Sequence, residues 1–443
     1  MNVRGVESPD GTVLARLDAA VAEHAAAAEQ LLVDLVAVPS VNPLQPGVEA
    51  SAYRGGESAA NTMLAEWMSS IGAENHAVPG EADRDNLVSI LRGTGSGRSL
   101  AVNAHIDTVA SQDGWATDPW VAVVDRDRIY GLGTTDMKAA HAASWLAFKA
   151  LSEVGVRLAG DLQLHSVIGE ETMSHEIGTT AVLEAGFRTD AALVPEPTSG
   201  DDGALHVANT AAGNYLFSMT VRGKSTHWAS RNLAIRAGGG GDEVGVNAID
   251  KAFYVYSALR QLEEQWAFSK THPQFPPGAF IIHPGVLHAD VGFAAAPYFP
   301  DRARFDCLLS FPPGETSEAI REEVEGHIRA ASAIDPWLAT HPVQFEWIDT
   351  WPPAYTEPTS DFANVVLDAR NSVAELLGDE PVQHPRTNGA QSDASFYEAQ
   401  GVPALVCGPG NLPSAHAANE FVDRRLIPAT AQMILRTALG WSG

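Results

Sequence analysis

Histidine and carboxylate side chains recur along this chain in short motifs. They are His105 and Asp107 in A-H-I-D-T-V, Asp136 in G-T-T-D-M-K, Glu170 and Glu171 in G-E-E, Glu196 in P-E-P, and His416 and Glu420 in A-H-A-A-N-E. The segments before His105, Glu170 and Glu196 are apolar enough to form buried strands. In open α/β sheets, ligands bind beyond the carboxyl ends of the strands. Because burying unpaired charge is costly and metal coordination offsets that cost, the pattern predicts a metal site.

These residue types suit a hydrolase with two metal ions. Imidazole and carboxylate groups bind zinc and similar cations, and no thiolate is needed. One carboxylate shared by two ions would set them about 3.5–4 Å apart. Asp107 lies two residues after His105, so on a strand its carboxylate can accept the ring N–H of that histidine. Glu170 and Glu171 point apart on an extended chain, so one can bind metal while the other acts as a general base.

The elements that must position these groups alternate between helix and strand. Periodic apolar residues predict helices at 12–37, 57–73, 137–153 and 176–186, and extended segments at 87–92, 99–104, 122–130, 161–168 and 190–194. Such alternation is typical of an α/β fold with a mostly parallel or mixed sheet lying between helices.

The pattern changes near Ala204. Extended segments at 205–223, 279–287 and 302–311 accompany helices at 247–268 and 316–332, which together predict a small α+β unit. Near Pro336 the chain returns to the first pattern, with a helix at 360–377, a strand at 402–407 and a helix at 424–439. We therefore expect a catalytic domain formed by 1–205 and 332–443, with an inserted domain at 206–331.

The composition indicates a soluble cytoplasmic protein. The 443 residues carry a formal net charge of −27, which argues against nucleic acid or an anionic membrane as a partner. The two cysteines, Cys307 and Cys407, cannot form a disulfide framework, which favours the cytoplasm. No apolar stretch of about 18 residues is present to span a bilayer, and the first residues lack the apolar core of a signal peptide.

Taken together, the motifs resemble those of the dinuclear-zinc amidohydrolases and metallopeptidases. That family includes acetylornithine deacetylase, succinyl-diaminopimelate desuccinylase, aminoacylase and the glutamate carboxypeptidases. The resemblance covers nearly the whole chain, from L-V-A-V-P-S-V-N-P through G-K-S-T-H-W-A and G-V-N-A-I to A-H-A-A-N-E-F-V. It implies an aminopeptidase-like α/β catalytic domain with an inserted lid or dimerisation domain. The implied reaction is hydrolysis of an amide C–N bond in an N-acyl amino acid or small peptide.

The resemblance also implies a metal-ligand set. Asp136 is expected to bridge two divalent ions, zinc in the first place, with cobalt and manganese as alternatives. His105 and Glu196 complete one site, and Glu171 and His416 complete the other.

Further roles follow from the same resemblance. Glu170 is expected to act as the general base that deprotonates the bridging water and then protonates the leaving nitrogen. Asp107 orients the histidine two residues before it, and a cis peptide follows Asp136. His227, in the inserted segment, matches a lid histidine that stabilises the oxyanion in a neighbouring subunit's site in several members. The expected partners are therefore a small-molecule substrate and a second copy of the chain, joined through the inserted domain.

Several positions depart from the family pattern. Ser310 and Ser395 stand where arginines for a substrate carboxylate are common, Pro297 stands for an asparagine, and Leu132 stands for the arginine of G-R-G. A glycine-rich stretch at 231–243 is additional. The arginine losses favour an alternative substrate class, with release of an amine by hydrolytic deamination of a non-peptide aromatic compound. An alternative of another class is a non-catalytic binding protein that keeps the fold.

Overall fold

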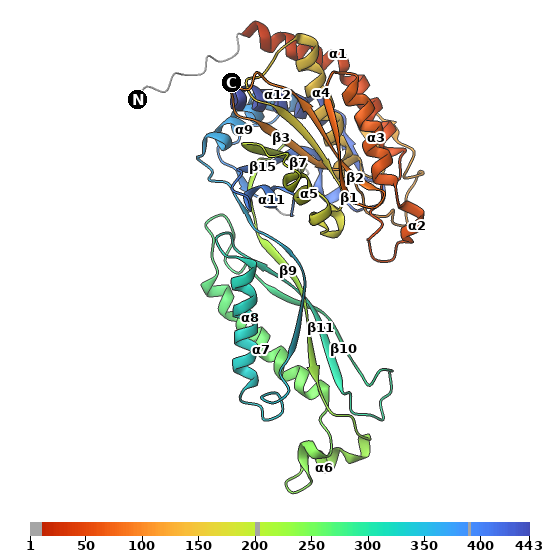
Figure 1. Ribbon diagram of the computed structural model, residues 1–443, viewed down its shortest axis with the longest axis vertical. Coiled ribbons are helices and arrows are strands. Elements are labelled where there is room, and N and C mark those ends of the chain that lie inside the picture. Colours follow the sequence, from red (N-terminus) through yellow and green to blue (C-terminus); the bar gives the residue numbers. More distant parts are fainter. Residues whose placement is uncertain (1–10, 200–203, 389–390) are drawn as a thin grey trace. The chain divides into compact units, whose positions relative to one another are not determined.

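The computed structural model describes residues 11–199, 204–388 and 391–443 (Figure 1). The chain divides into two compact units, Met1–Ala211 with Ala354–Gly443, and Ala212–Pro353. We call them the catalytic unit and the inserted unit. The inserted domain was expected at 206–331, so its C-terminal limit lies 22 residues further along the chain than expected.

The catalytic unit is a mixed sheet between helices. Its helices are α1 (Gly11–Val36), α2 (Ala50–Tyr53), α3 (Gly56–Ser69), α4 (Ala139–Val154), α5 (Thr179–Glu184), α9 (Asp361–Ser372), α10 (Ala374–Leu377), α11 (Ala394–Glu398) and α12 (Leu426–Ser442). Its main-sheet strands are β1 (Glu74–Glu81), β2 (Arg84–Leu91), β3 (Leu100–His105), β6 (Leu162–Val167), β7 (Ala191–Ser199), β8 (Ala208–Ala211), β13 (Ala354–Tyr355), β14 (Arg386–Thr387) and β15 (Ala404–Asn411). This architecture confirms the expected fold class.

The order of the strands brings the motifs that predict a metal site to the same end of the sheet. Within the described residues the strands run β1-β2-β6-β3-β7-β15-β8-β13, with β14 beside β8. β3 is parallel to both β6 and β7, and β15 is parallel to β7. Their carboxyl ends therefore meet, because parallel neighbours share a direction.

Alternating side chains on the strands build a core on each face of the sheet. Val102 on β3 packs in the core formed with α1, α4 and α12, whose apolar side chains are buried there. Ala101 points to the opposite face and packs with Leu183 of α5 and Tyr397 of α11. This division follows from the two-residue period of a strand.

A small antiparallel sheet lies beside the main one. It contains β16 (Phe421–Asp423), β5 (Arg128–Tyr130) and β4 (Val123–Asp125), in that order. The segment 122–130 was expected as one strand, but it is a hairpin that turns at Arg126, whose φ is +51°. The pairing of β16 with β5 anchors the segment that immediately follows His416 and Glu420.

The inserted unit is an antiparallel sheet with two long helices. The sheet order is β10 (Ile282–Asp290), β11 (Arg302–Phe311), β9 (Gly213–Arg222) and β12 (Gln344–Trp351), and the helices are α6 (Arg231–Ile235), α7 (Ala248–Ser269) and α8 (Ser317–Ser332). Asn247 and Thr316 cap α7 and α8 by accepting backbone N–H groups, which explains where these helices begin. The strand β12 pairs with β9, and this pairing extends the unit beyond residue 331.

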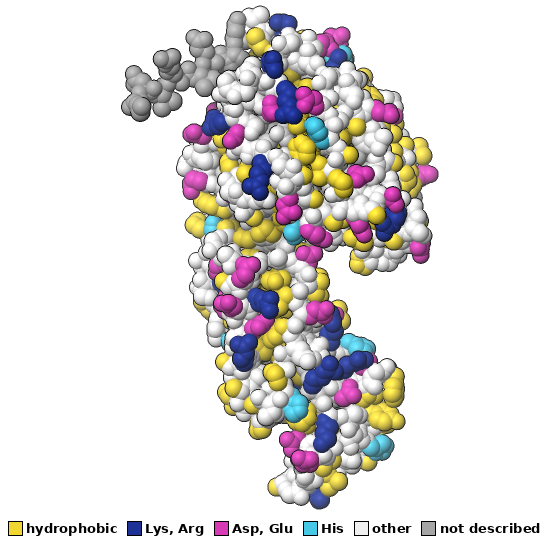
Figure 2. Space-filling view, in the orientation of Figure 1, with side chains coloured by type: hydrophobic (Ala, Val, Ile, Leu, Met, Phe, Trp, Pro, Cys, Tyr) yellow, Lys and Arg dark blue, Asp and Glu magenta, His cyan; other side chains and the backbone are white. Residues whose placement is uncertain are grey.

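The surface carries charges of both signs. On the face in Figure 2, Asp and Glu side chains are interspersed with Lys and Arg. In the part of the chain that the structure describes, no helix has the length and apolar character needed to cross a membrane.

Candidate metal centre

Tight turns that contain glycines in the left-handed backbone conformation hold the acidic residues near the carboxyl ends of the strands. Asp136 lies in the turn Thr134–Lys138, between β5 and α4, and the peptide bond from Asp136 to Met137 is cis, as expected. Glu170 and Glu171 lie in a short 3-10 helix, Glu170–Thr172, that follows Gly169. Gly169 has a φ of +86°, and a Cβ there would lie 2.7 Å from the carbonyl oxygen of Ser174. Only glycine fits this turn without strain.

One group of donor atoms joins the end of β3 and a residue within β7 to the Asp136 turn. The Nε2 atom of His105 lies 3.0 Å from Oδ1 of Asp136 and 3.8 Å from Oε1 of Glu196. His105 is the last residue of β3, and Glu196 lies within β7. Their donor atoms are close enough for one metal ion to contact all three side chains.

A second group of donor atoms shares Asp136. The Nε2 atom of His416 lies 3.3 Å from Oδ2 of Asp136 and 3.0 Å from Oε2 of Glu171. His416 has a left-handed backbone with a φ of +56°, and its carbonyl oxygen accepts a hydrogen bond from Gln112. Each imidazole therefore approaches a different oxygen of the Asp136 carboxylate, which is the arrangement that a bridging ligand needs.

Glu170 lies beside these groups without belonging to either. Its Oε2 atom is 3.9 Å from Nε2 of His105. Burial raises the pKa of Glu170 well above its ordinary value, and the neighbouring Glu196 and Glu171 raise it further. A largely buried carboxylate with a raised pKa is suited to accepting and returning a proton.

The centre holds more negative charge than its two imidazoles can balance. Burial raises the pKa values of Glu171 and Glu196. Burial also opposes ionisation of His105, but the carboxylates of Glu196 and Asp136 raise its pKa well above the usual value. Oε1 of Glu171 is buried and has no hydrogen-bond partner among the described residues. This crowding of oxygen and nitrogen donors fits divalent cations, which would neutralise the excess charge.

The contact between Asp107 and His105 differs from the expectation. Nδ1 of His105 lies 2.9 Å from the backbone carbonyl oxygen of Asp107, whereas the carboxylate Oδ1 is 3.6 Å away. The strand β3 ends at His105, so Asp107 lies beyond it and the two side chains are not a same-face pair on a strand. The expected carboxylate acceptor is therefore corrected to the backbone carbonyl. The Asp107 carboxylate instead accepts the backbone N–H of Glu171 at 3.1 Å.

Comparison with known proteins decides the family. Residues 101–440 match the peptidase family M20/M25/M40. The chain belongs to this family. It is therefore a metal-dependent hydrolase of amide bonds, as expected from the motifs, and the non-catalytic alternative is excluded.

Relatives within the family differ in their substrates. The N-formyl-4-amino-5-aminomethyl-2-methylpyrimidine deformylase of Halalkalibacterium halodurans is 33% identical over 355 residues, which cover 76% of this chain and 78% of that protein. The acetylornithine deacetylase of Proteus mirabilis is 26% identical over 413 residues, which cover 91% and 94%. Among solved structures, the Bacillus subtilis YXEP protein, a dinuclear metal binding peptidase of the M20 family, matches with a TM-score of 0.64 at 16% identity, covering 94% of this chain and 98% of that one.

Glu420 holds the turn that carries Asp136, a role that the sequence did not predict. Its buried carboxylate accepts the backbone N–H groups of Gly133, Thr135 and Asp136 at 2.9, 2.7 and 3.0 Å. Burial raises its pKa to about 8. The only sequence signal was its place in A-H-A-A-N-E, four residues after His416.

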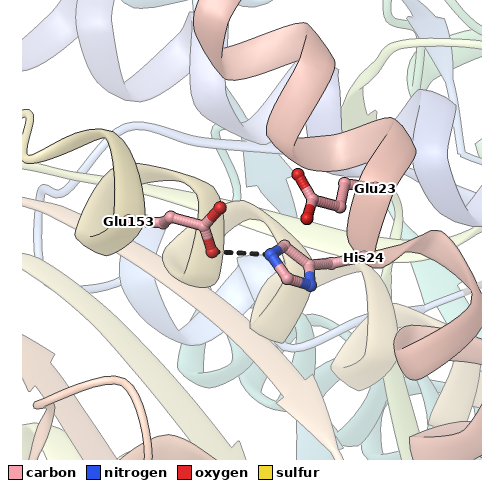
Figure 3. Close-up of side chains that lie close together, drawn as sticks. All are labelled: Glu23, His24 and Glu153. Atoms are coloured by element: carbon pink, nitrogen blue, oxygen red, sulfur yellow. Dashed lines mark hydrogen bonds and ion pairs between the residues drawn. The ribbon is translucent and has the colours of Figure 1, made fainter.

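A third group of histidine and carboxylate side chains, of the kinds that bind metal ions, lies on the surface of the catalytic unit. Figure 3 shows Glu23 and His24 of α1 close to Glu153 of α4. Nε2 of His24 lies 2.6 Å from Oε2 of Glu153, and Nζ of Lys149 lies 2.8 Å from the same oxygen. The lysine already balances this carboxylate, so we interpret the group as a partly exposed ion-pair network between α1 and α4. Such pairs contribute little to stability.

The remaining predicted site residues belong to neither of the two donor groups. His227 belongs to the inserted unit, where Nδ1 accepts the backbone N–H of Ala229 and its backbone pairs with Tyr298. Ser310, on β11, accepts the backbone N–H of Ile281. Ser395, on α11, is fully buried. Neither serine supplies the positive charge that an arginine would offer to a substrate carboxylate.

Proposed function

We propose that this enzyme removes a small acyl group from an N-acylated amine, with two zinc ions as its cofactor and cobalt or manganese as substitutes. His105, Asp136 and Glu196 hold one ion, and Asp136, Glu171 and His416 hold the other. The observation that carries this assignment is the position of the Asp136 carboxylate, whose two oxygens face different imidazoles.

Two divalent ions bound there would lower the pKa of a water molecule and polarise the carbonyl group of the substrate. Glu170 takes the proton of the attacking water, because its carboxylate lies beside both donor groups and serves neither as a ligand. It then gives that proton to the leaving nitrogen, so the amine departs in neutral form. Burial raises the pKa of Glu170 well above its usual value, which supports its holding the proton until the nitrogen leaves.

The proposed substrate is a small N-formyl or N-acetyl derivative of a non-peptide amine. The name of the deformylase relative, at 33% identity, supports an amine of the aminomethylpyrimidine type. Ser310 and Ser395 support it as well, because the two positions that would bind an amino-acid carboxylate carry no charge. The bond that breaks in this reaction is the amide C–N bond between the acyl group and the amine. The aromatic amine is therefore released by deacylation, and not by the hydrolytic deamination considered above.

An N-acyl amino acid is the second candidate substrate. The match to acetylornithine deacetylase, which covers 91% of the chain, favours it. The test compares kcat/KM of the zinc-loaded enzyme on N-formyl-4-amino-5-aminomethyl-2-methylpyrimidine, N-acetylornithine and an unblocked dipeptide. We expect the formyl pyrimidine to give the highest value. A higher value for N-acetylornithine or the dipeptide would overturn the proposed substrate class and leave the amidohydrolase mechanism in place.

The inserted unit is proposed to act as a lid and as the contact between two copies of the chain, with His227 serving the partner's site. In support, β10 is an edge strand of its sheet, and its Val286 and Leu287 are exposed. An edge strand with apolar side chains favours pairing with another chain. We place the homodimer in the cytoplasm, because Cys307 and Cys407 are both buried and unpaired.

A further inference from the structure

A buried side chain near the N-terminus, Asn42, joins the two turns that follow β3 and β6. Its Nδ2 group donates to Oδ2 of Asp107 at 2.8 Å and to Oγ1 of Thr172 at 3.0 Å. Asp107 follows His105 by two residues, and Thr172 is in the same short helix as Glu170 and Glu171. One amide group thus connects the two segments that carry the proposed ligands and the proposed base.

Asn42 has no freedom to turn its amide group. Its Oδ1 atom accepts the backbone N–H of Leu44 at 3.0 Å and Nη2 of Arg84 at 3.2 Å. With both ends of the amide engaged, the NH₂ group must face Asp107 and Thr172. The Asn42 side chain is fully buried, so water does not compete for these bonds.

Behind Asn42 lies a buried ion pair. The guanidinium of Arg84 makes two parallel hydrogen bonds to Glu57, Nε to Oε2 at 2.5 Å and Nη2 to Oε1 at 2.7 Å. Both side chains are fully buried. A buried ion pair costs desolvation energy and is weak evidence for stability, so a gain in stability does not by itself explain this pair. The two carboxylate oxygens of Glu57 fix the plane of the guanidinium, and the guanidinium in turn fixes the orientation of the Asn42 amide group.

We propose that Asn42 is a positioning residue for the metal centre, held in place by Arg84 and Glu57. It acts through Asp107, whose Oδ2 atom accepts from both Asn42 and the backbone N–H of Glu171. The network sets the distance between the His105 segment and the Glu170–Thr172 turn, which carry ligands of the two proposed metal sites. This inference rests on the metal ligands proposed above.

The test measures metal binding and does not depend on knowing the substrate. Asn42→Ala removes both donated bonds and should weaken zinc binding by roughly 10–100-fold, the range for outer partners of metal ligands. Zinc affinity is measured by competition with a chromophoric chelator, and the visible spectrum of the cobalt-substituted protein should change because the coordination geometry changes. Asn61→Ala is the matched control, since Asn61 is also buried and donates to the backbone of Asp85 and Ser166 without contacting Asp107.

The outcomes separate this inference from the proposed function. If the wild-type chain binds no divalent ion, the proposed function fails. If the wild type and Asn61→Ala bind two ions, and Asn42→Ala binds them as tightly with an unchanged cobalt spectrum, the positioning role is refuted. Should Asn42→Ala not fold, Thr172→Val replaces it, with Ser174→Ala as its control, because Oγ1 of Thr172 bonds both Asn42 and Oγ of Ser174. A cobalt spectrum that is altered in Thr172→Val but not in Ser174→Ala supports the proposal, and any other result contradicts it.

Discussion

The carboxylate of Glu420 accepts the backbone N–H of Asp136 at 3.0 Å, although 284 residues separate them in the chain. The same carboxylate also holds the N–H groups of Gly133 and Thr135. The turn that carries the shared metal ligand is thus fastened to the loop that carries His416. Both donor groups depend on this one attachment.

Replacing Glu420 by Gln should loosen the Asp136 turn. An amide has one acceptor oxygen, so at least one of the three backbone N–H groups would face its NH₂ group instead. We expect zinc affinity or turnover to fall by roughly 10–100-fold. Zinc titration and steady-state kinetics measure both quantities. Glu398→Gln is the control, since Glu398 also accepts a backbone N–H, that of Ala404, away from this turn; equal behaviour of the two variants would contradict the role of Glu420.

Replacing Glu170 by Gln should separate proton transfer from metal binding. Glutamine keeps the size of the side chain but cannot accept and return a proton. Turnover should fall about 10²–10⁴-fold, while metal content and thermal unfolding stay at their wild-type values. A variant that keeps most of its turnover would show that another group is the base.

His227→Ala tests the inserted unit. If His227 stabilises the oxyanion, its loss should lower kcat about 10²–10³-fold with metal content unchanged. Mixing this variant with Glu170→Gln should restore part of the activity, because in a mixed dimer one site regains both groups. Sedimentation analysis reports whether dimers form. Full activity of His227→Ala in a strictly monomeric preparation would remove His227 from the mechanism.

The buried His165 gives a prediction about stability and pH. Burial lowers its pKa from 6.5 to about 3, with Nδ1 at 2.6 Å from the Tyr397 hydroxyl. The folded state therefore keeps His165 neutral, while the unfolded chain takes up a proton below pH 6.5. The contribution of the neutral His165 to the free energy of unfolding is complete above pH 6.5. It is lost as the pH falls toward 3, at about 1.4 kcal/mol per pH unit.

Urea unfolding at pH 7 and pH 5 measures this effect. The free energy of unfolding of the wild type should fall on going from pH 7 to pH 5. In His165→Gln this fall should be smaller by about 1–2 kcal/mol. Equal losses in the two proteins would show that His165 is not a neutral buried group.

Much of the catalytic unit could be predicted because its signals are local. The apolar segments before His105 and Glu170 are buried strands, and the histidine and glutamate side chains predicted for the site lie at or just after the ends of these strands. In the inserted unit, the start of α7 was predicted to within one residue because apolar periodicity begins beside its cap, Asn247. The segment 122–130 was less informative, since its turn at Arg126 carries no glycine or proline.

Other features depend on contacts between distant segments and could not be predicted. The extent of the inserted unit depends on the pairing of β12 with β9, more than a hundred residues apart. The end of β3 at His105 decides that the backbone of Asp107, and not its carboxylate, meets the imidazole. The hydrogen bonds of Asn42 and Glu420 reach across the fold, so their residue types alone gave no sign of them.

Metal stoichiometry tests the central claim, that Asp136 serves two metal sites. Purified wild-type protein and Asp136→Ala, both dialysed against zinc and then against metal-free buffer, are analysed by mass spectrometry for bound metal. We predict two ions per wild-type chain and fewer than one in Asp136→Ala, because the variant removes a ligand from both sites, with chelation abolishing and zinc restoring wild-type activity. A wild-type chain that is active without a divalent ion, or an Asp136→Ala chain that retains both ions, would contradict the account.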